Sequence, residues 1–76
     1  MDLGKMMIVL AEAVSLGDEL VVELDGEQVV ARRGLAVIGR LAAPPARVQS
    51  AIIGACGVAT GRVVDVDHCT ATLALS

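Results

Sequence analysis

The chain has 76 residues, enough for one domain, and 55% of them are hydrophobic although Phe, Tyr and Trp are all absent. A domain of this size buries only about 60% of the surface of its unfolded chain, so we expect apolar surface to remain for a second copy or a partner. The net charge of −3 excludes strong steering of the whole molecule toward a polyanion, and the missing aromatic rings exclude base stacking.

The sequence also argues against membrane insertion and export. The longest uncharged stretch, residues 48–61, has 14 residues, fewer than the roughly 20 that a membrane-spanning helix needs. The first residues lack the basic start and the cleavage site of a signal peptide. Two cysteines without an export signal are typical of reduced thiols, so we expect a cytoplasmic protein in which Cys56 and Cys69 are small buried residues.

Short strands are predicted for the first half of the chain. An apolar run at residues 6–12 has the length of a strand, and residues 13–18 form either a turn or a short helix that ends at a glycine. Residues 20–25 alternate apolar and acidic side chains, which is the period of a half-buried strand. Asp25-Gly26 then predicts a tight type I′ turn into a returning strand at residues 27–33.

A further strand at residues 35–40 precedes the one predicted helix, at about residues 45–56. Two prolines open this helix, because proline fits the first helical position. Val48, Ile52 and Cys56 recur every four residues and predict one stripe that faces the core.

Two strands, at residues 58–67 and 69–75, complete the chain. The last strand alternates apolar side chains with threonine, alanine and serine, so we expect one buried face. Gly61 indicates a bend or bulge in the strand before it. Gly54, inside the helix, indicates either close backbone packing or a helix that frays early.

The order of these elements predicts a mostly β fold with one helix. We expect a single domain over residues 1–76, built as a small β-barrel or a coiled antiparallel sheet of about six strands. The helix at about residues 45–56 plugs this barrel.

The charges are distributed unevenly along the chain. Residues 1–30 carry seven acids and one lysine (−6), and residues 31–76 carry five arginines and two aspartates (+3), which together give −3. The candidate residues for binding a partner or nucleic acid are Arg32, Arg33, Arg40, Arg47 and Arg62. They form either a local basic surface or the scattered, solvated charges of an ordinary protein surface.

The densest group of reactive side chains lies at residues 65–69, with Cys56 as a further thiol. A zinc site needs three or four converging ligands, and no Cys-x-x-Cys or His-x-x-x-His pair is present. Adjacent residues of a strand face opposite ways, so His68 cannot readily activate the Cys69 thiol. We therefore expect no enzyme, no catalytic residue, no metal and no cofactor, with a turn-capping His68 and two structural thiols. The alternative, a thiol or metal site at Cys56, His68 and Cys69, predicts zinc retained after purification.

Three stretches resemble a known family. They are residues 17–24 (GDELVVEL), 28–32 (QVVAR) and 36–41 (AVIGRL), followed by a helix and two strands. In this order, over residues 14–75, they resemble the HIRAN domain. The most specific similarity is the strand at residues 36–41, which leads into a helix that begins with proline. The resemblance implies a small modified barrel, found alone in bacteria and phages or fused to helicases, that binds the 3′ end of single-stranded DNA.

The chain departs from the HIRAN pattern where that family binds DNA. Members carry a loop resembling N-P-Y-D-x-N-A between the second and third strands, and its aromatic residues stack on the terminal bases. Here Asp25-Gly26 replaces the loop and the tyrosine is missing. Arg32 and Arg40 are the positions that the resemblance puts near a family ligand.

The resulting prediction is a non-enzymatic binding module that acts through a protein–protein interface. Such a bacterial or phage accessory protein would be a subunit, an adaptor or a phage-type inhibitor of a larger complex, and the interface would be filled by a partner or by a second copy in a homodimer. The small size, the surplus apolar surface and the acidic hairpin at residues 18–27 motivate this hypothesis. The alternative function is binding of single-stranded DNA ends, as the HIRAN resemblance implies.

Overall fold

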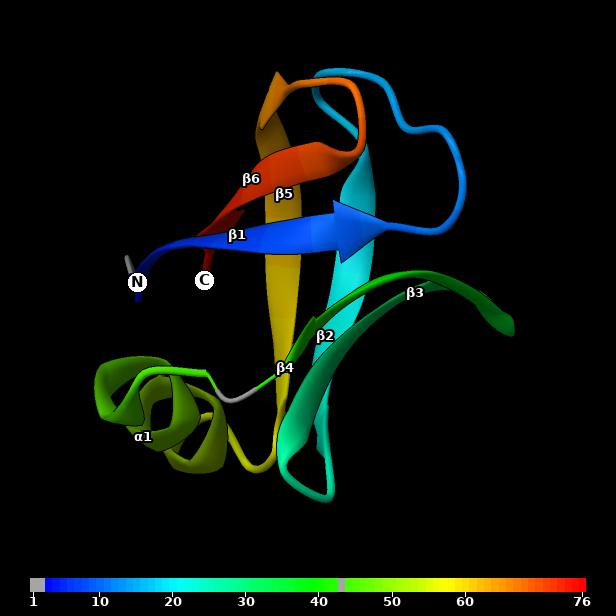
Figure 1. Cartoon of the computed structure of the whole chain (residues 1–76). Helices are drawn as coiled ribbons and strands as arrows, with labels where there is room; N and C mark the ends of the chain where they lie inside the picture. The colour runs from blue at the N-terminus through cyan, green and yellow to red at the C-terminus, as the bar shows by residue number, and fades with distance from the viewer. Residues whose placement is uncertain (1–2, 43) are drawn as a thin grey trace.

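The computed structural model describes residues 3–42 and 44–76. In this part of the chain six strands and one helix follow each other (Figure 1). They are β1 (Gly4–Leu10), β2 (Glu19–Asp25), β3 (Gln28–Arg33), β4 (Ala36–Ala42), α1 (Ala46–Gly54), β5 (Val58–Val66) and β6 (Thr70–Leu75). The fold class predicted from the sequence, a mostly β barrel with one helix, is confirmed.

The strands form a closed antiparallel barrel in the order β1-β4-β3-β2-β5-β6, with β6 pairing back onto β1. Closure pairs the strand edges that would otherwise invite aggregation. The barrel is not equally tight all round, because β1 pairs with β6 through six residue pairs but with β4 through two, Val9–Arg40 and Leu10–Gly39. The pairing of β1 with β4 is therefore the shortest in the barrel, and we call it the β1–β4 seam.

The helix α1 lies at one end of the barrel, between β4 and β5 in the chain (Figure 1). Val48 and Ile52 are buried and belong to the core cluster, which confirms that part of the predicted apolar stripe. Arg47 Nη2 donates a hydrogen bond of 3.2 Å to the carbonyl of Lys5, so the first turn of α1 is tied to β1. No helix within residues 3–42 and 44–76 is long and apolar enough to cross a membrane.

Aliphatic and methionine side chains from all six strands fill the barrel. In β6 the predicted alternation is confirmed, since Ala71, Leu73 and Leu75 are buried while the residues between them are half-buried. Among the described residues no polar or charged side chain is buried. The interior is thus an apolar core, and any polar contact with a ligand must be made on the outer surface.

The turn of the β2–β3 hairpin differs from the predicted one. Asp25 pairs with Gln28, so the loop residues are Gly26 and Glu27. Gly26 has a φ of +63°, whereas Glu27 does not have a positive φ. A positive φ at the first central position alone is the pattern of a type II′ turn, so the prediction of a type I′ turn at Asp25-Gly26 was wrong by one residue. The β3–β4 turn, Gly34-Leu35, repeats this pattern.

The helix ends earlier than predicted. The backbone N–H groups of Cys56 and Gly57 donate to the carbonyls of Ile53 (3.1 Å) and Ile52 (2.9 Å), which is a Schellman cap. Cys56 lies beyond the helix and is exposed, so its predicted place on the buried stripe was wrong. A Cβ on Gly54 would meet nothing within 4 Å, so the early end of the helix, and not close packing, accounts for this glycine.

The sequence predicted a bend or bulge of β5 at Gly61, but the bulge lies at Val64. The register with β6 shifts between Val63 and Asp65, which leaves Val64 as the additional residue. Gly61 keeps its register and is buried. A Cβ there would lie 2.9 Å from a methyl group of Val22, so close packing inside the barrel accounts for this glycine.

The first strand begins and ends two residues earlier than predicted. Ala11 and Glu12 lie beyond the end of β1, and their backbone N–H groups both donate to the carbonyl of Ile38, at 2.7 and 3.3 Å. Between β1 and β2 the turn alternative is observed, where the N–H of Asp18 donates to the carbonyl of Ser15 at 3.1 Å. No helix forms in residues 13–18.

Candidate interaction surface

Arg32 lies on the outer face of β3 and forms an ion pair with Glu23 of β2. The two side chains are only about one-third exposed, at 33% and 31%. Val30, which pairs with Glu23 and points out of the barrel, is nevertheless completely buried. The Arg32–Glu23 pair therefore helps to cover an apolar side chain, and the Arg32 charge already has a partner.

The other four candidate arginines are exposed, and each donates a hydrogen bond within the protein. Their acceptors are the carbonyl of Ala13 for Arg33 (3.2 Å), Oε1 of Gln28 for Arg40 (3.4 Å), the carbonyl of Lys5 for Arg47 (3.2 Å) and Oε1 of Glu19 for Arg62 (3.4 Å). Only the Arg62–Glu19 contact is an ion pair, and exposed ion pairs contribute about 0–1 kcal/mol.

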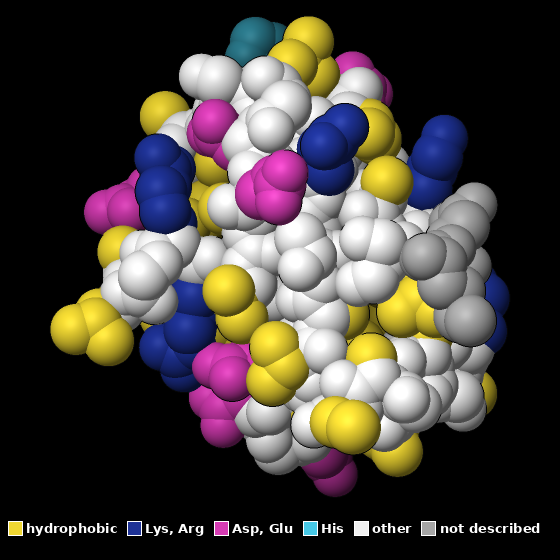
Figure 2. Space-filling model, turned by 180° about the vertical axis from the view of Figure 1, so that it is seen from behind, with side chains coloured by type: hydrophobic (Ala, Val, Ile, Leu, Met, Phe, Trp, Pro, Cys, Tyr) yellow, Lys and Arg dark blue, Asp and Glu magenta, His cyan; other side chains and the backbone are white. Residues whose placement is uncertain are grey.

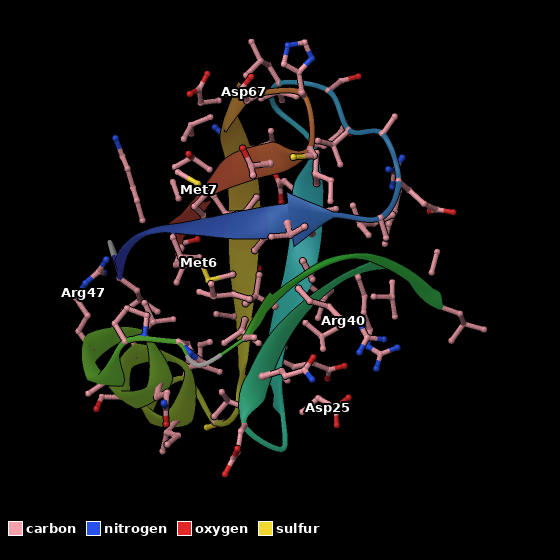
Figure 3. All side chains as sticks on the ribbon, in the orientation of Figure 1. Met6, Met7, Asp25, Arg40, Arg47 and Asp67 are labelled. Atoms are coloured by element: carbon pink, nitrogen blue, oxygen red, sulfur yellow. The ribbon has the colours of Figure 1, made fainter. Side chains whose placement is uncertain are left out.

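The barrel brings Arg32 and Arg40 onto one outer face of β3 and β4, and it does not collect all five arginines there. Arg47 lies beside α1 at one edge of the molecule, whereas Arg40 lies over β3 and β4 (Figure 3). On the face drawn in Figure 2, basic side chains lie among acidic ones and do not form one continuous patch. The arginines are thus separate positions on the surface.

The reactive side chains do not converge. Cys56 and Cys69 lie beyond opposite ends of the nine-residue β5, which spans about 26 Å at 3.3 Å per residue. Both thiols are exposed, so their predicted burial was wrong. His68 adjoins Cys69 in the β5–β6 turn, where the side chain of Asp67 accepts the backbone N–H of His68 at 2.8 Å. The sequence analysis expected His68 to cap this turn, but the capping side chain is that of Asp67.

Metal binding finds no support at these residues. In the described part of the chain no three His, Cys, Asp or Glu side chains come close enough together to hold a metal ion. A small cavity of about 250 Å³ beside His68 and Cys69 is lined otherwise by residues 10–13. Cys56 is too far away to complete a site there, so the three-residue thiol or metal site does not assemble.

An apolar strip lies on the outer surface of β1. Met6 points into the barrel and Met7 points out (Figure 3), with exposed fractions of 4% and 57%. Val9, on the same side as Met7, is 60% exposed. On β6 the half-buried Thr72 lies opposite Met7, and the half-buried Thr70 lies opposite Val9. We call the set Met7, Val9, Thr70 and Thr72 the β1–β6 face.

A shallow groove of about 590 Å³ adjoins this face. Its polar and small lining residues are Lys5, Glu19, Thr60, Arg62, Ala74 and Ser76. The strand register places Lys5 beside Ala74 and Ala74 beside Arg62, so two cations flank a small residue. We call this feature the cationic groove. The sequence prediction included Arg62 but missed Lys5, although the alternation along β1 would have put Lys5 on the exposed side with Met7.

Comparisons of the chain with protein-family models, with curated proteins and with solved structures found no match. The HIRAN resemblance therefore stays a prediction from the sequence.

Proposed function

We propose that this protein is a non-enzymatic binding module that contacts a protein through the β1–β6 face. The proposal is carried by the exposure of two large apolar side chains, Met7 and Val9, on one side of one strand. Single exposed apolar residues are ordinary, whereas contiguous ones rimmed by polar groups are typical of interaction sites. The bound protein is a partner, for which this chain serves as a subunit, an adaptor or an inhibitor, or it is a second copy of the chain.

The size of the apolar contribution limits what this face can do alone. Full burial of a Val or Met side chain contributes about 1.5–3 kcal/mol, so covering the exposed parts of Met7 and Val9 would contribute about 2–3 kcal/mol together. That free energy is too small for a stable complex, since a micromolar affinity requires about 8 kcal/mol. The partner must therefore also contact the groups around the β1–β6 face.

The proposal is tested by light scattering over a concentration series and by capture from the native lysate. We expect association or capture for the unchanged protein and its loss in the double variant Met7→Thr/Val9→Thr. Val58→Thr is the matched control, because Val58 is 50% exposed but lies on β5, in register with Glu23. A protein that stays monomeric at every concentration and captures nothing would contradict the proposal.

Binding of single-stranded DNA ends is the second candidate function. The observation in its favour is the position of Arg32 and Arg40 on one outer face of β3 and β4. Fluorescence anisotropy with single-stranded oligonucleotides at about 50 mM salt tests it, because phosphate contacts give an affinity that falls steeply as salt is added. Absence of binding at that salt concentration ends this candidate.

A further inference from the structure

We infer that the cationic groove binds an acidic, extended segment of the protein partner, with carboxylates at alternate positions. The inference rests on the proposed function, since it takes the ligand to be a protein, and it adds a second contact beside the β1–β6 face. The two features are continuous, because Lys5 and Met7 share the outer side of β1 and pair with Ala74 and Thr72 on β6.

The spacing of the two cations suits an extended chain. Lys5 on β1 and Arg62 on β5 are separated by one strand, β6, which places their backbones about 9.6 Å apart. Alternate side chains of an extended segment are about 6.6 Å apart on one face. The long, flexible stems of lysine and arginine bridge the difference, and Ala74 between them leaves room for the segment.

The cations of the groove are available to a ligand. The Lys5 side chain has no hydrogen bond or ion pair within residues 3–42 and 44–76. Arg62 contacts Glu19 at 3.4 Å, but these two side chains are 64% and 61% exposed, and such pairs are weak. The guanidinium carries five N–H donors, so it can donate to a second carboxylate without releasing the first. Arg47, hydrogen-bonded to the carbonyl of Lys5, is a further cation close to β1 but does not line the groove.

An acidic peptide fits these groups better than a nucleic acid. Single-stranded nucleic acids are held by a basic groove together with aromatic platforms, and this chain has no aromatic residue. Glu19 within the groove and the net charge of −3 oppose a dense polyanion. Met7 and Thr72 lie next to the groove. Apolar side chains of an acidic peptide segment could pack against Met7, whereas the phosphates of a nucleic acid could not.

The inference is tested with an acetylated and amidated peptide, GEVEVG, added to the full chain and followed through its backbone amide NMR signals. The peptide GQVQVG is the uncharged control. We expect GEVEVG to shift the signals of the groove residues at about 20 mM salt and to bind more weakly at about 200 mM, since added salt screens exposed charges. The control peptide should leave these signals unchanged.

Two charge-matched variants locate the binding. Lys5→Ala should weaken binding of GEVEVG about two- to fivefold, as expected for one exposed ion pair. Arg33→Ala removes the same charge on β3, away from the groove, and should bind like the unchanged protein. Equal binding by the two variants overturns the inference, as does equal binding of GQVQVG. A single-stranded oligonucleotide that displaces the peptide from the groove at the same salt concentration also overturns it.

These outcomes separate the inference from the proposed function. If GEVEVG does not bind while capture through Met7 and Val9 persists, the cationic groove is not the peptide site and the proposed function stands. If both fail, the interaction surface as a whole is contradicted.

Discussion

Among single residues, two positions of this barrel hold glycine because a Cβ would have no room there, and not because the backbone has a positive φ. A Cβ on Gly39 would lie 2.7 Å from the backbone carbonyl of Val9, and one on Gly61 would lie 2.9 Å from a methyl group of Val22. A methyl group can be displaced by a change of rotamer, but a carbonyl of the neighbouring strand cannot. Gly39 is therefore the more critical of the two, and it belongs to one of the two pairs of the β1–β4 seam.

Gly39→Ala should lower the free energy of unfolding by about 1–3 kcal/mol, the usual effect of forcing additional atoms into a packed core. The control is Gly54→Ala, where a Cβ meets nothing within 4 Å and the change should be neutral or stabilising by up to about 1 kcal/mol. Urea denaturation of both variants measures the difference. Equal stability of the two variants would show that the close approach to Val9 is not rigid.

The backbone conformation of Cys56 lowers the stability of the folded protein, because its φ of +63° lies in the left-handed region. This conformation costs a residue other than glycine about 1–2 kcal/mol of folding free energy. A glycine avoids that cost but lowers stability by about 0.5–1 kcal/mol, because its unfolded chain has more conformational entropy. Cys56→Gly should therefore raise the free energy of unfolding slightly, by about 0.5–1 kcal/mol. Cys56→Ala keeps the left-handed cost and should leave stability unchanged, so a gain for alanine equal to that for glycine would refute the explanation.

At the scale of elements, the sequence predicted each strand and the helix within a few residues, because periods of two and four residues are local signals. Errors arose where a local signal was ambiguous. Asp25-Gly26 resembles a type I′ turn, and only the pairing of Asp25 with Gln28 shows where the turn begins. Gly61 resembles a bend, and only its neighbours across the barrel show that it fills a tight space.

The helix α1 gives the clearest test at this scale. Ile52 and Ile53 are adjacent residues of one type, but Ile52 is completely buried and Ile53 is 63% exposed. Ile52→Ala should cost about 2–5 kcal/mol, which is comparable with the whole stability of so small a domain. Ile53→Ala should change stability by less than about 0.5 kcal/mol. Thermal unfolding followed by circular dichroism measures both, and similar transitions for the two variants would mean that α1 does not plug the barrel.

At the scale of the whole molecule, strand order and surface could not be derived from the sequence. The pairing of β2 with β5 joins residues about 40 positions apart, and no local pattern specifies such a contact. The same long-range pairing decides which charges meet. The β2–β5 pairing joins Arg62 to Glu19, and the pairing of β1 with β6 closes the barrel, so the cationic groove and the β1–β6 face exist only in the closed barrel.

The proposed function depends most on contact between the β1–β6 face and a protein. The most direct measurement is a photo-crosslinking amino acid placed at position 7, in place of Met7, and irradiated in the native lysate. The same amino acid in place of Val58 is the control on β5. We predict a discrete crosslinked protein, or a crosslinked second copy, from position 7 and none from position 58. No product from position 7, or the same product from both positions, would contradict the claim.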